Sequence, residues 1–270
     1  MNRKFALIGG DLRIVNLAKM LTDDNNLVYQ YNSNCTSLED TIKNADIVVS
    51  SIPFSKNGID VYAPFNSHPI PIDDLAKCLN NKTFFAGSIP NIFYEITKNH
   101  NVQIFDLMEQ EDLTILNTIA TAEGAISDII LNMPKNIHGS KVLILGFGRV
   151  AKTLAIKLKG LDAKITCAAR KDKDFAWMET LGFEKTNINK LKENLNEFDV
   201  IVNTVPKLIL DKEKLKIVKK DCLLIDLASK PGGINEQTCK ELNLKFIWAL
   251  AIPRKSSTFN ISTIYKKYNI

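Results

Sequence analysis

Short apolar runs, rich in β-branched and aromatic residues, alternate with amphipathic stretches of helical length along almost the whole chain. This alternation is typical of α/β proteins, in which parallel strands form a sheet and helices cover both of its faces. The runs fall into two groups, one in each half of the chain, and they predict two sheets. The first group comprises residues 5–9, 27–31, 46–52, 83–88 and 102–107, and the second comprises residues 141–145, 163–168, 199–203, 222–228 and 245–250.

A long helical pattern separates the two groups of strands. It begins with acidic residues at 109–112 and ends at Pro134, as expected for a helix that favours acids in its first turn and is terminated by proline. The sequence therefore predicts an α/β protein with two doubly wound parallel-sheet lobes joined by a long helix. The expected domains are a first lobe at 1–110, the connecting helix at 111–137, a second lobe at 138–250, and a C-terminal segment at 251–270 that packs back on the first lobe.

Composition is that of a folded globular protein. The 270 residues are 45% apolar and 24% charged, which argues against disorder, collagen-like repeats and coiled coil. No charge-free apolar run approaches the roughly 18 residues that cross a bilayer, and there is no signal-peptide pattern, so we expect a cytoplasmic protein without a membrane partner. The five cysteines are widely spaced without a C-x-x-C pair, so we expect reduced, mostly buried thiols and no metal site.

Charge is distributed unevenly between the two halves. Residues 1–137 hold 10 basic and 16 acidic side chains, whereas residues 138–270 hold 25 and 14, so their net charges are −6 and +11. A phosphate-bearing ligand is therefore expected in the second half. No basic run with interleaved aromatic residues occurs, which argues against a nucleic-acid partner.

Residues 146–151 read Gly-Phe-Gly-Arg-Val-Ala directly after an expected strand. In this G-x-G-x-x-A pattern the first glycine permits a sharp turn, the second lets a pyrophosphate approach the backbone, and the small third residue lets helix and strand pack closely. The pattern predicts a dinucleotide site in which helix N-terminal amides meet the phosphate. A glycine turn used only for packing is the alternative. The expected cofactor contacts are Gly146, Phe147, Gly148, Arg149 and Val150.

The end of the next strand distinguishes NAD from NADP. NAD enzymes usually carry an acidic residue there that binds the ribose 2′-hydroxyl, whereas this chain has Arg170 and Lys171. Arg170 can form a bidentate contact with a 2′-phosphate and Lys171 adds positive charge, so we expect NADP. A solvated basic turn is the alternative.

Polar or glycine-rich segments follow three further strands, at the edge where α/β sheets bind ligands. Residues 203–206 would lie near the nicotinamide ribose, although a loop that caps a helix fits equally, and the glycines of 228–233 would let the backbone approach a planar ring. In the first lobe, residues 9–13 repeat the strand, turn and helix pattern without G-x-G. Arg13 is expected to bind a carboxylate there, with a surface first-turn residue as the alternative. The further expected contacts are Asn203, Thr204, Val205, Pro206, Ala228, Ser229 and Lys230.

Five segments carry a resemblance to a known family. LIGGDLR, TAEGAI, IHGSKVLILGFGRVAKTLA, VNTVP and LIDLASKPGG occur in this order between residues 7 and 233, and together they resemble the A-subunit family of dipicolinate synthases. The resemblance implies a flavodoxin-like first lobe, a connecting helix that carries TAEG, and a Rossmann second lobe that binds NADP. It also implies an enzyme of the mother cell of sporulating bacteria that acts with a flavoprotein B subunit. That enzyme converts a dihydro- or hydroxytetrahydrodipicolinate, a small cyclic dicarboxylate, into dipicolinate, and we expect a homodimer or a larger assembly.

The implied reaction gives roles to particular residues. A ring carbon gives hydride to the nicotinamide of NADP while a base or water takes a ring proton. The dianionic substrate needs cations, and the candidates are Arg13, Lys230 and Arg254. Thr121 and Glu123 are expected to face the cleft, with Glu123 as the acid/base group; a helix carboxylate that caps or pairs is the alternative for Glu123. The three histidines, His68, His100 and His138, are expected to be structural.

The chain departs from the family pattern in two places. The family's glycine and lysine after Pro253 are replaced, and its arginine before Pro-Gly-Gly is Lys230 here. Two other functions therefore stay open: an NADP-dependent dehydrogenase of another small carboxylate, and a cofactor-binding regulatory or scaffold subunit. Against the first, no histidine follows an expected strand of the second lobe.

Overall fold

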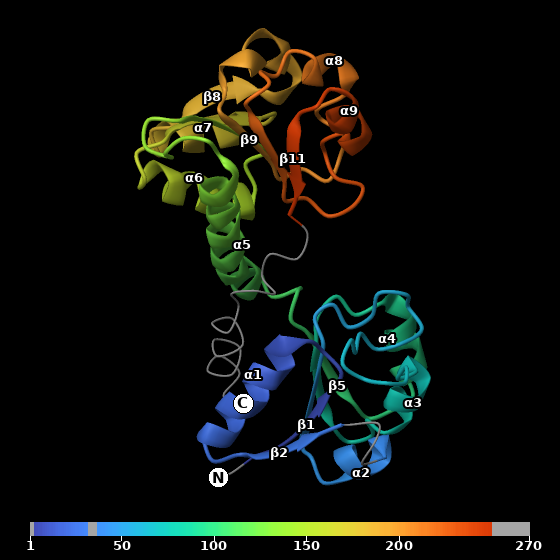
Figure 1. The fold of residues 1–270 in the computed structure, drawn as a ribbon. Helices are drawn as coiled ribbons and strands as arrows, with labels where there is room; N and C mark the ends of the chain where they lie inside the picture. Colours follow the sequence, from blue (N-terminus) through green and yellow to red (C-terminus); the bar gives the residue numbers. More distant parts are fainter. Residues whose placement is uncertain (1–2, 32–36, 250–270) are drawn as a thin grey trace. The chain divides into compact units, whose positions relative to one another are not determined.

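The structure, a computed structural model, describes residues 3–31 and 37–249, with the backbone alone at 192 and 193. Contacts between Cα atoms divide the chain after Leu116, inside its longest helix, into two compact units. We call the described residues 3–116 the first lobe and 117–249 the second lobe (Figure 1). The C-terminal segment expected at 251–270, with Arg254, lies outside the described residues.

The first lobe is a five-stranded parallel sheet with helices on both faces. Its strand order is β2-β1-β3-β4-β5, which is the flavodoxin-like order that the resemblance implied. Strand β1 shows how the two faces arise: Phe5 and Leu7 pack with α1, whereas Ala6 and Ile8 pack with α2, α3 and α4. The elements are β1 (Lys4–Ile8), α1 (Leu12–Asp23), β2 (Leu27–Gln30), α2 (Leu38–Lys43), β3 (Ile47–Ser50), α3 (Ile72–Lys77), β4 (Thr83–Ala86), α4 (Asn91–Thr97) and β5 (Gln103–Asp106).

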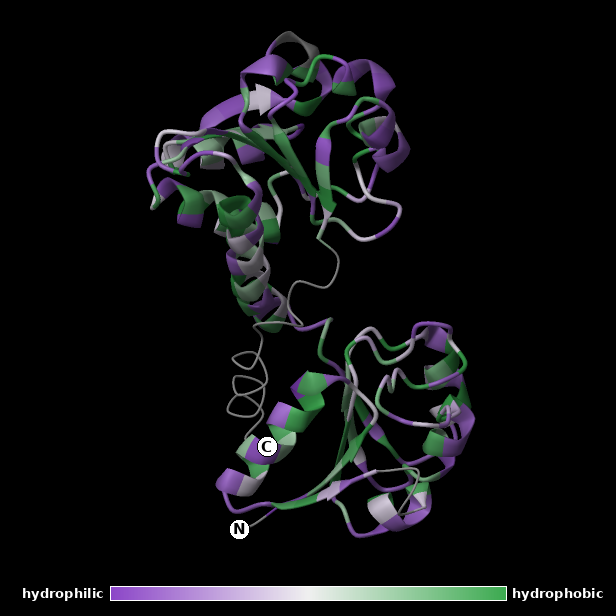
Figure 2. Cartoon of the chain, viewed as in Figure 1, coloured by the Kyte–Doolittle hydropathy of each residue, from purple (hydrophilic) through white to green (hydrophobic). Residues whose placement is uncertain are grey.

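The second lobe is a six-stranded parallel sheet of order β11-β10-β9-β6-β7-β8, the doubly wound order of a Rossmann fold. Val142 and Ile144 of β6 pack with α6 and α7, and Leu143 and Leu145 pack on the other face. Hydrophobic strands fill the interior of each lobe and hydrophilic positions gather on the outer helices (Figure 2). The elements are β6 (Lys141–Leu145), α6 (Arg149–Lys159), β7 (Lys164–Ala169), α7 (Asp172–Thr180), β8 (Glu184–Asn187), η1 (Ile188–Glu193), η2 (Leu195–Glu197), β9 (Val200–Asn203), α8 (Lys212–Leu215), β10 (Leu223–Asp226), α9 (Glu236–Glu241) and β11 (Lys245–Trp248).

Helix α5 (Glu111–Asn132) is the predicted long helix, and it carries the expected acids in its first turn. Its fully buried residues Ala122, Ala125 and Ile129 belong to the same core as α6 and α7. Among the described residues, α5 is the one helix long and apolar enough to cross a bilayer by length and composition. A core helix of a globular lobe meets the same criterion. Packing in the second lobe covers part of the apolar surface of α5, whereas Ile115, Ile130 and Leu131 are exposed.

All ten predicted strands are present, with bounds that differ from the expected ones by at most two residues where the structure describes them. Strand β8 is an eleventh that the apolar pattern did not predict. Its sequence, Glu-Lys-Thr-Asn, contains no apolar residue. An apolar sequence is not needed, because β8 pairs with β7 at the edge of the sheet and its residues are exposed or half-buried. An edge strand of this kind lacks the apolar run on which the prediction depends.

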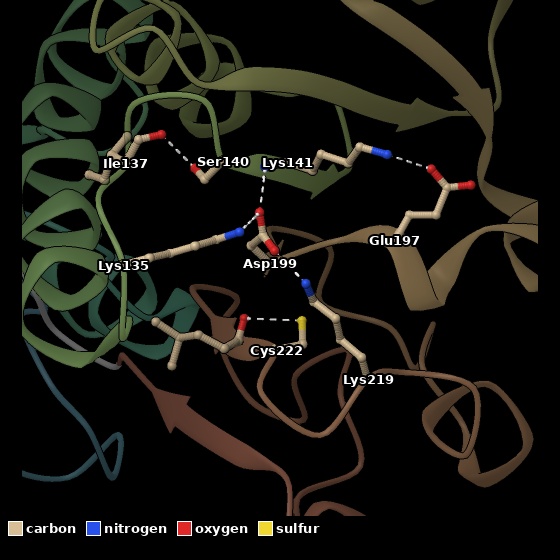
Figure 3. A network of polar contacts seen from close by, with 9 residues as sticks. Lys135, Ile137, Ser140, Lys141, Glu197, Asp199, Lys219 and Cys222 are labelled. Carbon is tan, nitrogen blue, oxygen red and sulfur yellow. Dashed lines mark hydrogen bonds and ion pairs between the residues drawn. The ribbon is translucent and has the colours of Figure 1, made fainter.

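Asp199, just before β9, connects the second sheet to the segment that follows α5 (Figure 3). Its carboxylate accepts the Lys141 N–H at 2.8 Å and pairs with Lys135 at 2.6 Å and with Lys219. Burial alone would raise the pKa of Asp199, but the hydrogen bonds from Lys135, Lys219 and Lys141 outweigh burial and lower the pKa to about 2. This network lies at the amino ends of the strands, whereas ligands of such sheets bind at the carboxyl ends, where the glycine loop lies. We therefore assign the network to the stability of the lobe.

Candidate functional site

The predicted cofactor residues of the second lobe lie at the carboxyl edge of its sheet. The strand order reverses between β6 and β9, and doubly wound sheets bind ligands at such a switch point. Three loops meet there, namely residues 146–148 after β6, 204–206 after β9 and 227–234 after β10. The candidate cofactor site is built from these loops.

Gly146 is required by the packing of two of these loops. Its φ is +99°, and a Cβ there would lie 2.5 Å from Oγ1 of Thr204 and 2.9 Å from a methyl carbon of Val205. The Thr204 hydroxyl also donates to the carbonyl of Leu145 at 2.8 Å. The first glycine therefore lets the loop after β9 lie directly against the end of β6.

Gly148, by contrast, has open space above it. A Cβ at Gly148 would meet no atom within 4 Å, and its φ of −80° is not restricted to glycine. It is the N-cap of the 11-residue helix α6, where no side chain caps the helix. Open backbone at a helix N-terminus is the geometry that accepts a phosphate. Packing alone accounts for Gly146 but not for Gly148, so the loop fits a pyrophosphate.

The other residues of the loop divide into support and surface. The Phe147 side chain is buried and packs edge-on against Phe183, with ring centres 6.4 Å apart, so only its backbone can face a ligand. Arg149 is exposed and Val150 is half-buried in the first turn of α6. Both lie beside the open backbone of Gly148.

Arg170 and Lys171 follow β7 directly, and both are exposed. Because β7 pairs with β6, they share the edge of the glycine loop, where the adenosine ribose of a dinucleotide lies. The nearest acids in the sequence, Asp172 and Asp174, belong to the first turn of α7 and not to the strand end. Two cations without a strand-end carboxylate fit a 2′-phosphate.

Asn203 lies beneath the loop after β9. It is fully buried, its Nδ2 donates to the carbonyl of Val205 at 2.9 Å, and its Oδ1 accepts the Val205 N–H at 3.1 Å. Direct contact between Asn203 and a cofactor stays a prediction, but both polar atoms of its amide are already in use. Thr204, Val205 and Pro206 are closer to the surface and remain the expected contacts of this loop.

Asp226, the last residue of β10, was not among the predicted site residues. It is 1% exposed and accepts four hydrogen bonds. Its Oδ1 accepts from Asn203 Nδ2 at 2.7 Å and from the Ala228 N–H at 3.0 Å, and its Oδ2 accepts from the Gly233 and Ile234 N–H groups at 2.7 and 3.0 Å. The available sequence signal was a carboxylate that directly ends an apolar strand.

The loop after Asp226 presents Ser229 and Lys230 at the surface. Ala228 is buried, and its carbonyl accepts the Trp248 indole N–H at 3.2 Å. The Lys230 ammonium lies 5.9 Å from the centre of a Trp248 ring. Ser229 and Lys230 are therefore accessible to a ligand, whereas Ala228 anchors the loop.

In the first lobe, Arg13 is held by its neighbours at the carboxyl edge of the sheet. Its Nε and Nη2 donate to the two carboxylate oxygens of Asp11 at 2.8 and 3.0 Å, and Nη2 also donates to the carbonyl of Ile52. These contacts use three of the five N–H donors of the guanidinium. Arg13 thus braces the segment after β3, and its role with a carboxylate stays a prediction.

A shallow hollow of about 240 Å³ lies in that segment. The Lys56 ammonium sits 3.7 Å from the ring centre of Tyr62, and the Tyr62 carbonyl accepts the Gly10 N–H at 2.8 Å. The hollow therefore lies against the predicted Gly9-Gly10 turn. Sequence reasoning missed it because residues 51–71 show no periodic pattern. It is lined by Lys56, Asn57, Asp60, Val61, Tyr62, Ala63 and Pro64.

The two candidates in α5 contact other helices or their own backbone. Glu123 is exposed and pairs with Lys157 of α6 at 3.0 Å, and the Thr121 hydroxyl donates to the Asn117 carbonyl at 3.3 Å. This ion pair is the alternative that the sequence left open for Glu123. Of the histidines, His138 lies 3.4 Å from Asp162 at the surface, His68 is exposed, and His100 is half-buried.

Comparisons with known proteins agree with this architecture. Residues 4–108 match the family model of the N-terminal domain of the dipicolinate synthase A-subunit, and residues 106–238 match that of the NAD-binding domain of D-isomer specific 2-hydroxyacid dehydrogenases. The chain is 27% identical over 264 residues to the A-subunit of the dipicolinate synthase of Bacillus subtilis, which covers 93% of this chain and 89% of that protein.

Two solved structures share the fold over almost the whole chain. The crystal structure of the A-subunit of Bacillus subtilis dipicolinate synthase gives a TM-score of 0.85 at 24% identity and covers 100% of this chain and 95% of that one. The corresponding protein of Bacillus halodurans gives a TM-score of 0.84 at 25% identity, covering 99% and 96%. The resemblance that the sequence motifs indicated is therefore confirmed: the chain is similar along nearly its full length to the A-subunit family of dipicolinate synthases, and its second lobe is similar to the NAD-binding domain of D-isomer specific 2-hydroxyacid dehydrogenases.

Proposed function

We propose that this chain is the NADP-dependent oxidoreductase subunit of a dipicolinate synthase, and that it oxidises a dihydro- or hydroxytetrahydrodipicolinate to dipicolinate. The observation that carries the proposal is the open Gly148 backbone at a helix N-terminus together with Arg170 and Lys171 at the next strand end. Similarity to the Bacillus subtilis protein supports the choice of substrate.

When bound, NADP would accept a hydride from a ring carbon of the substrate while a ring proton goes to a base or water, so a dihydro ring yields dipicolinate, NADPH and a proton. A hydroxytetrahydro ring must in addition lose one molecule of water. The protein binds and orients the reactants. The N-terminus of α6 holds the pyrophosphate, Arg170 and Lys171 hold the 2′-phosphate, and the loops after β9 and β10 orient the nicotinamide half.

Carboxylate binding is proposed for Arg13 and Lys230, each at the ligand edge of its own lobe, and for Arg254. The guanidinium N–H groups of Arg13 that do not donate to Asp11 or Ile52 are the ones proposed to bind a carboxylate. Glu123 has less support as the acid/base group because its carboxylate pairs with Lys157. Water is the simpler proton acceptor in this proposal.

The relatives are themselves described as one subunit of a larger enzyme, which supports a further proposal about assembly. We propose that the chain works with a flavoprotein B subunit, as a homodimer or larger assembly, in the cytoplasm of the mother cell of a sporulating bacterium.

The purified chain should be assayed with NADP and dihydrodipicolinate, with and without the flavoprotein partner, by following NADPH and dipicolinate absorbance. Equal formation of both products is expected. Oxidation of small 2-hydroxy acids instead would support the other dehydrogenase, and NADP binding without turnover under any condition would support a regulatory role.

A further inference from the structure

The Asp226 carboxylate is buried, and each of its four partners is an N–H donor. A carboxylate accepts at both oxygens, whereas an amide in its place would turn an NH₂ group toward two of these donors. Leaving a buried N–H donor without an acceptor lowers the stability of the fold, because no water molecule replaces the lost partner. Asp226 is therefore specified by chemistry and not by size.

These bonds join the two loops on one side of the switch point. Asn203, which donates to Asp226, also hydrogen-bonds the backbone of Val205 through both polar atoms of its amide. The loop after β10 also packs closely. A Cβ at Gly232 would lie 2.9 Å from Asp226 Oδ2, and a Cβ at Gly233 would overlap the Asn203 amide. The loops after β9 and β10 thus form one hydrogen-bonded unit around Asp226.

This unit reaches the glycine loop, because Val205 and Thr204 lie against Gly146. A dinucleotide bound at a switch point extends across the sheet edge, with its halves on opposite sides of that point. Arg170, proposed for the adenosine end, follows β7 on one side, and Asp226 ends β10 on the other. The Asp226 unit therefore underlies the nicotinamide half.

We propose that Asp226 is a positioning residue for the nicotinamide half of NADP: it fixes the loops 203–206 and 228–234 as one surface without touching the cofactor. The proposal rests on the proposed function, since it requires a bound NADP. It assigns no role to Asp226 toward the adenosine half.

The first lobe supplies a matched control. Asp106 ends β5, is 7% exposed, and accepts the N–H groups of Ser88, Ile89 and Met108 at 3.0, 2.7 and 2.8 Å. The same chemistry thus occurs at a strand end of the other lobe. Asp106→Asn should cost stability as Asp226→Asn does, but it should leave NADP affinity unchanged.

The experiment measures the affinities of the full chain for NADP and for 2′,5′-ADP, a fragment without the nicotinamide half, by calorimetry. Asp226→Asn should weaken NADP roughly tenfold or more and change 2′,5′-ADP by less than about twofold. Trp248 fluorescence, recorded in a Trp177→Phe background, should change in Asp226→Asn because the indole is bonded to Ala228 of the same loop.

If Asp226→Asn does not fold, Gly233→Ala tests the same unit by displacing the loop from Asn203, and it should give the same split between the ligands. Equal weakening of both ligands, unchanged NADP affinity in a folded variant, or a comparable NADP loss in Asp106→Asn would each overturn the proposal. Failure of the wild-type chain to bind NADP would instead overturn the proposed function.

Discussion

Thr118 of α5 and Thr153 of α6 share a hydrogen bond of 2.7 Å between their hydroxyl oxygens. One turn farther along, Glu123 and Lys157 form an ion pair at 3.0 Å. The sequence separations of these pairs are 35 and 34, so the two helices run parallel. Because α6 begins beside the glycine loop, Lys157 lies about 12 Å from Arg149 along the helix axis. Glu123 therefore contacts α6 two turns away from the expected phosphate position.

This relationship predicts that Glu123→Gln remains an active enzyme. A general acid or base contributes about 10²–10⁴-fold, whereas an exposed ion pair contributes little to stability or rate. We expect kcat to fall by less than about tenfold, in steady-state assays of NADPH formation. Lys157→Met is the control and should behave as Glu123→Gln does. A loss of more than about 100-fold in the glutamine variant alone would return the acid/base role to Glu123.

The fold could be predicted from the sequence because buried parallel strands leave a strong apolar signal, as in residues 142–145 of β6. Strand β8 was not predicted, because it lies at the edge of its sheet and its residues are polar. The glycine loop could be predicted because its G-x-G-x-x-A pattern directly follows an apolar strand. The structure gives Gly146 a steric reason to be glycine, whereas the reason for Gly148 is the proposed pyrophosphate. The Asp226 network and the Asp11–Arg13 pair could not be predicted, since they depend on which loops meet in space and which buried donors need an acceptor.

The two glycines of the loop should respond oppositely to substitution. Gly148→Val places its side chain in open space, so the lobe should keep its stability while NADP binding is lost, because valine fills the volume that the pyrophosphate needs. Gly146→Ala should instead destabilise the lobe, since its φ is +99° and Thr204 lies 2.5 Å from the new Cβ. Thermal unfolding and calorimetric titration measure both effects. A folded Gly148→Val variant with wild-type affinity would show that the loop only packs.

Cofactor preference should depend on Arg170. We expect the wild-type chain to bind NADP more tightly than NAD, and Arg170→Asp to reduce or reverse that preference by replacing a cation near the 2′-phosphate with an anion. Lys171→Gln is the control and should weaken NADP without reversing the order. Calorimetry with both cofactors measures the ratio. Equal affinity of the wild type for NAD and NADP would contradict the prediction.

Asp199 should give the second lobe an acid-dependent stability. The pKa of this carboxyl is lowered to about 2 in the folded chain, below its ordinary value of 3.8. The stabilisation is therefore complete above about pH 4 and is lost as the pH falls through 2, and its size is about 2 kcal/mol. Denaturant unfolding should show a difference between wild type and Asp199→Asn that shrinks from pH 5 to pH 2. Glu197→Gln, which breaks an exposed pair with Lys141, should show little difference at any pH.

Arg13 is the residue on which the substrate proposal for the first lobe depends. Losing one charge-assisted contact should lower the affinity for dipicolinate about 10- to 150-fold in Arg13→Ala, which corresponds to about 1.5–3 kcal/mol, while NADP affinity stays constant because the glycine loop belongs to the other lobe. Since Arg13 also donates to the Ile52 carbonyl, the variant could act through the segment after β3. Asp11→Asn separates the two effects, because it keeps the guanidinium and its bond to Ile52 but removes the carboxylate that pairs with Arg13. If Arg13 contacts the substrate, Asp11→Asn should bind dipicolinate at least as tightly as the wild type; if Arg13→Ala binds dipicolinate as the wild type does, Arg13 is not a substrate residue.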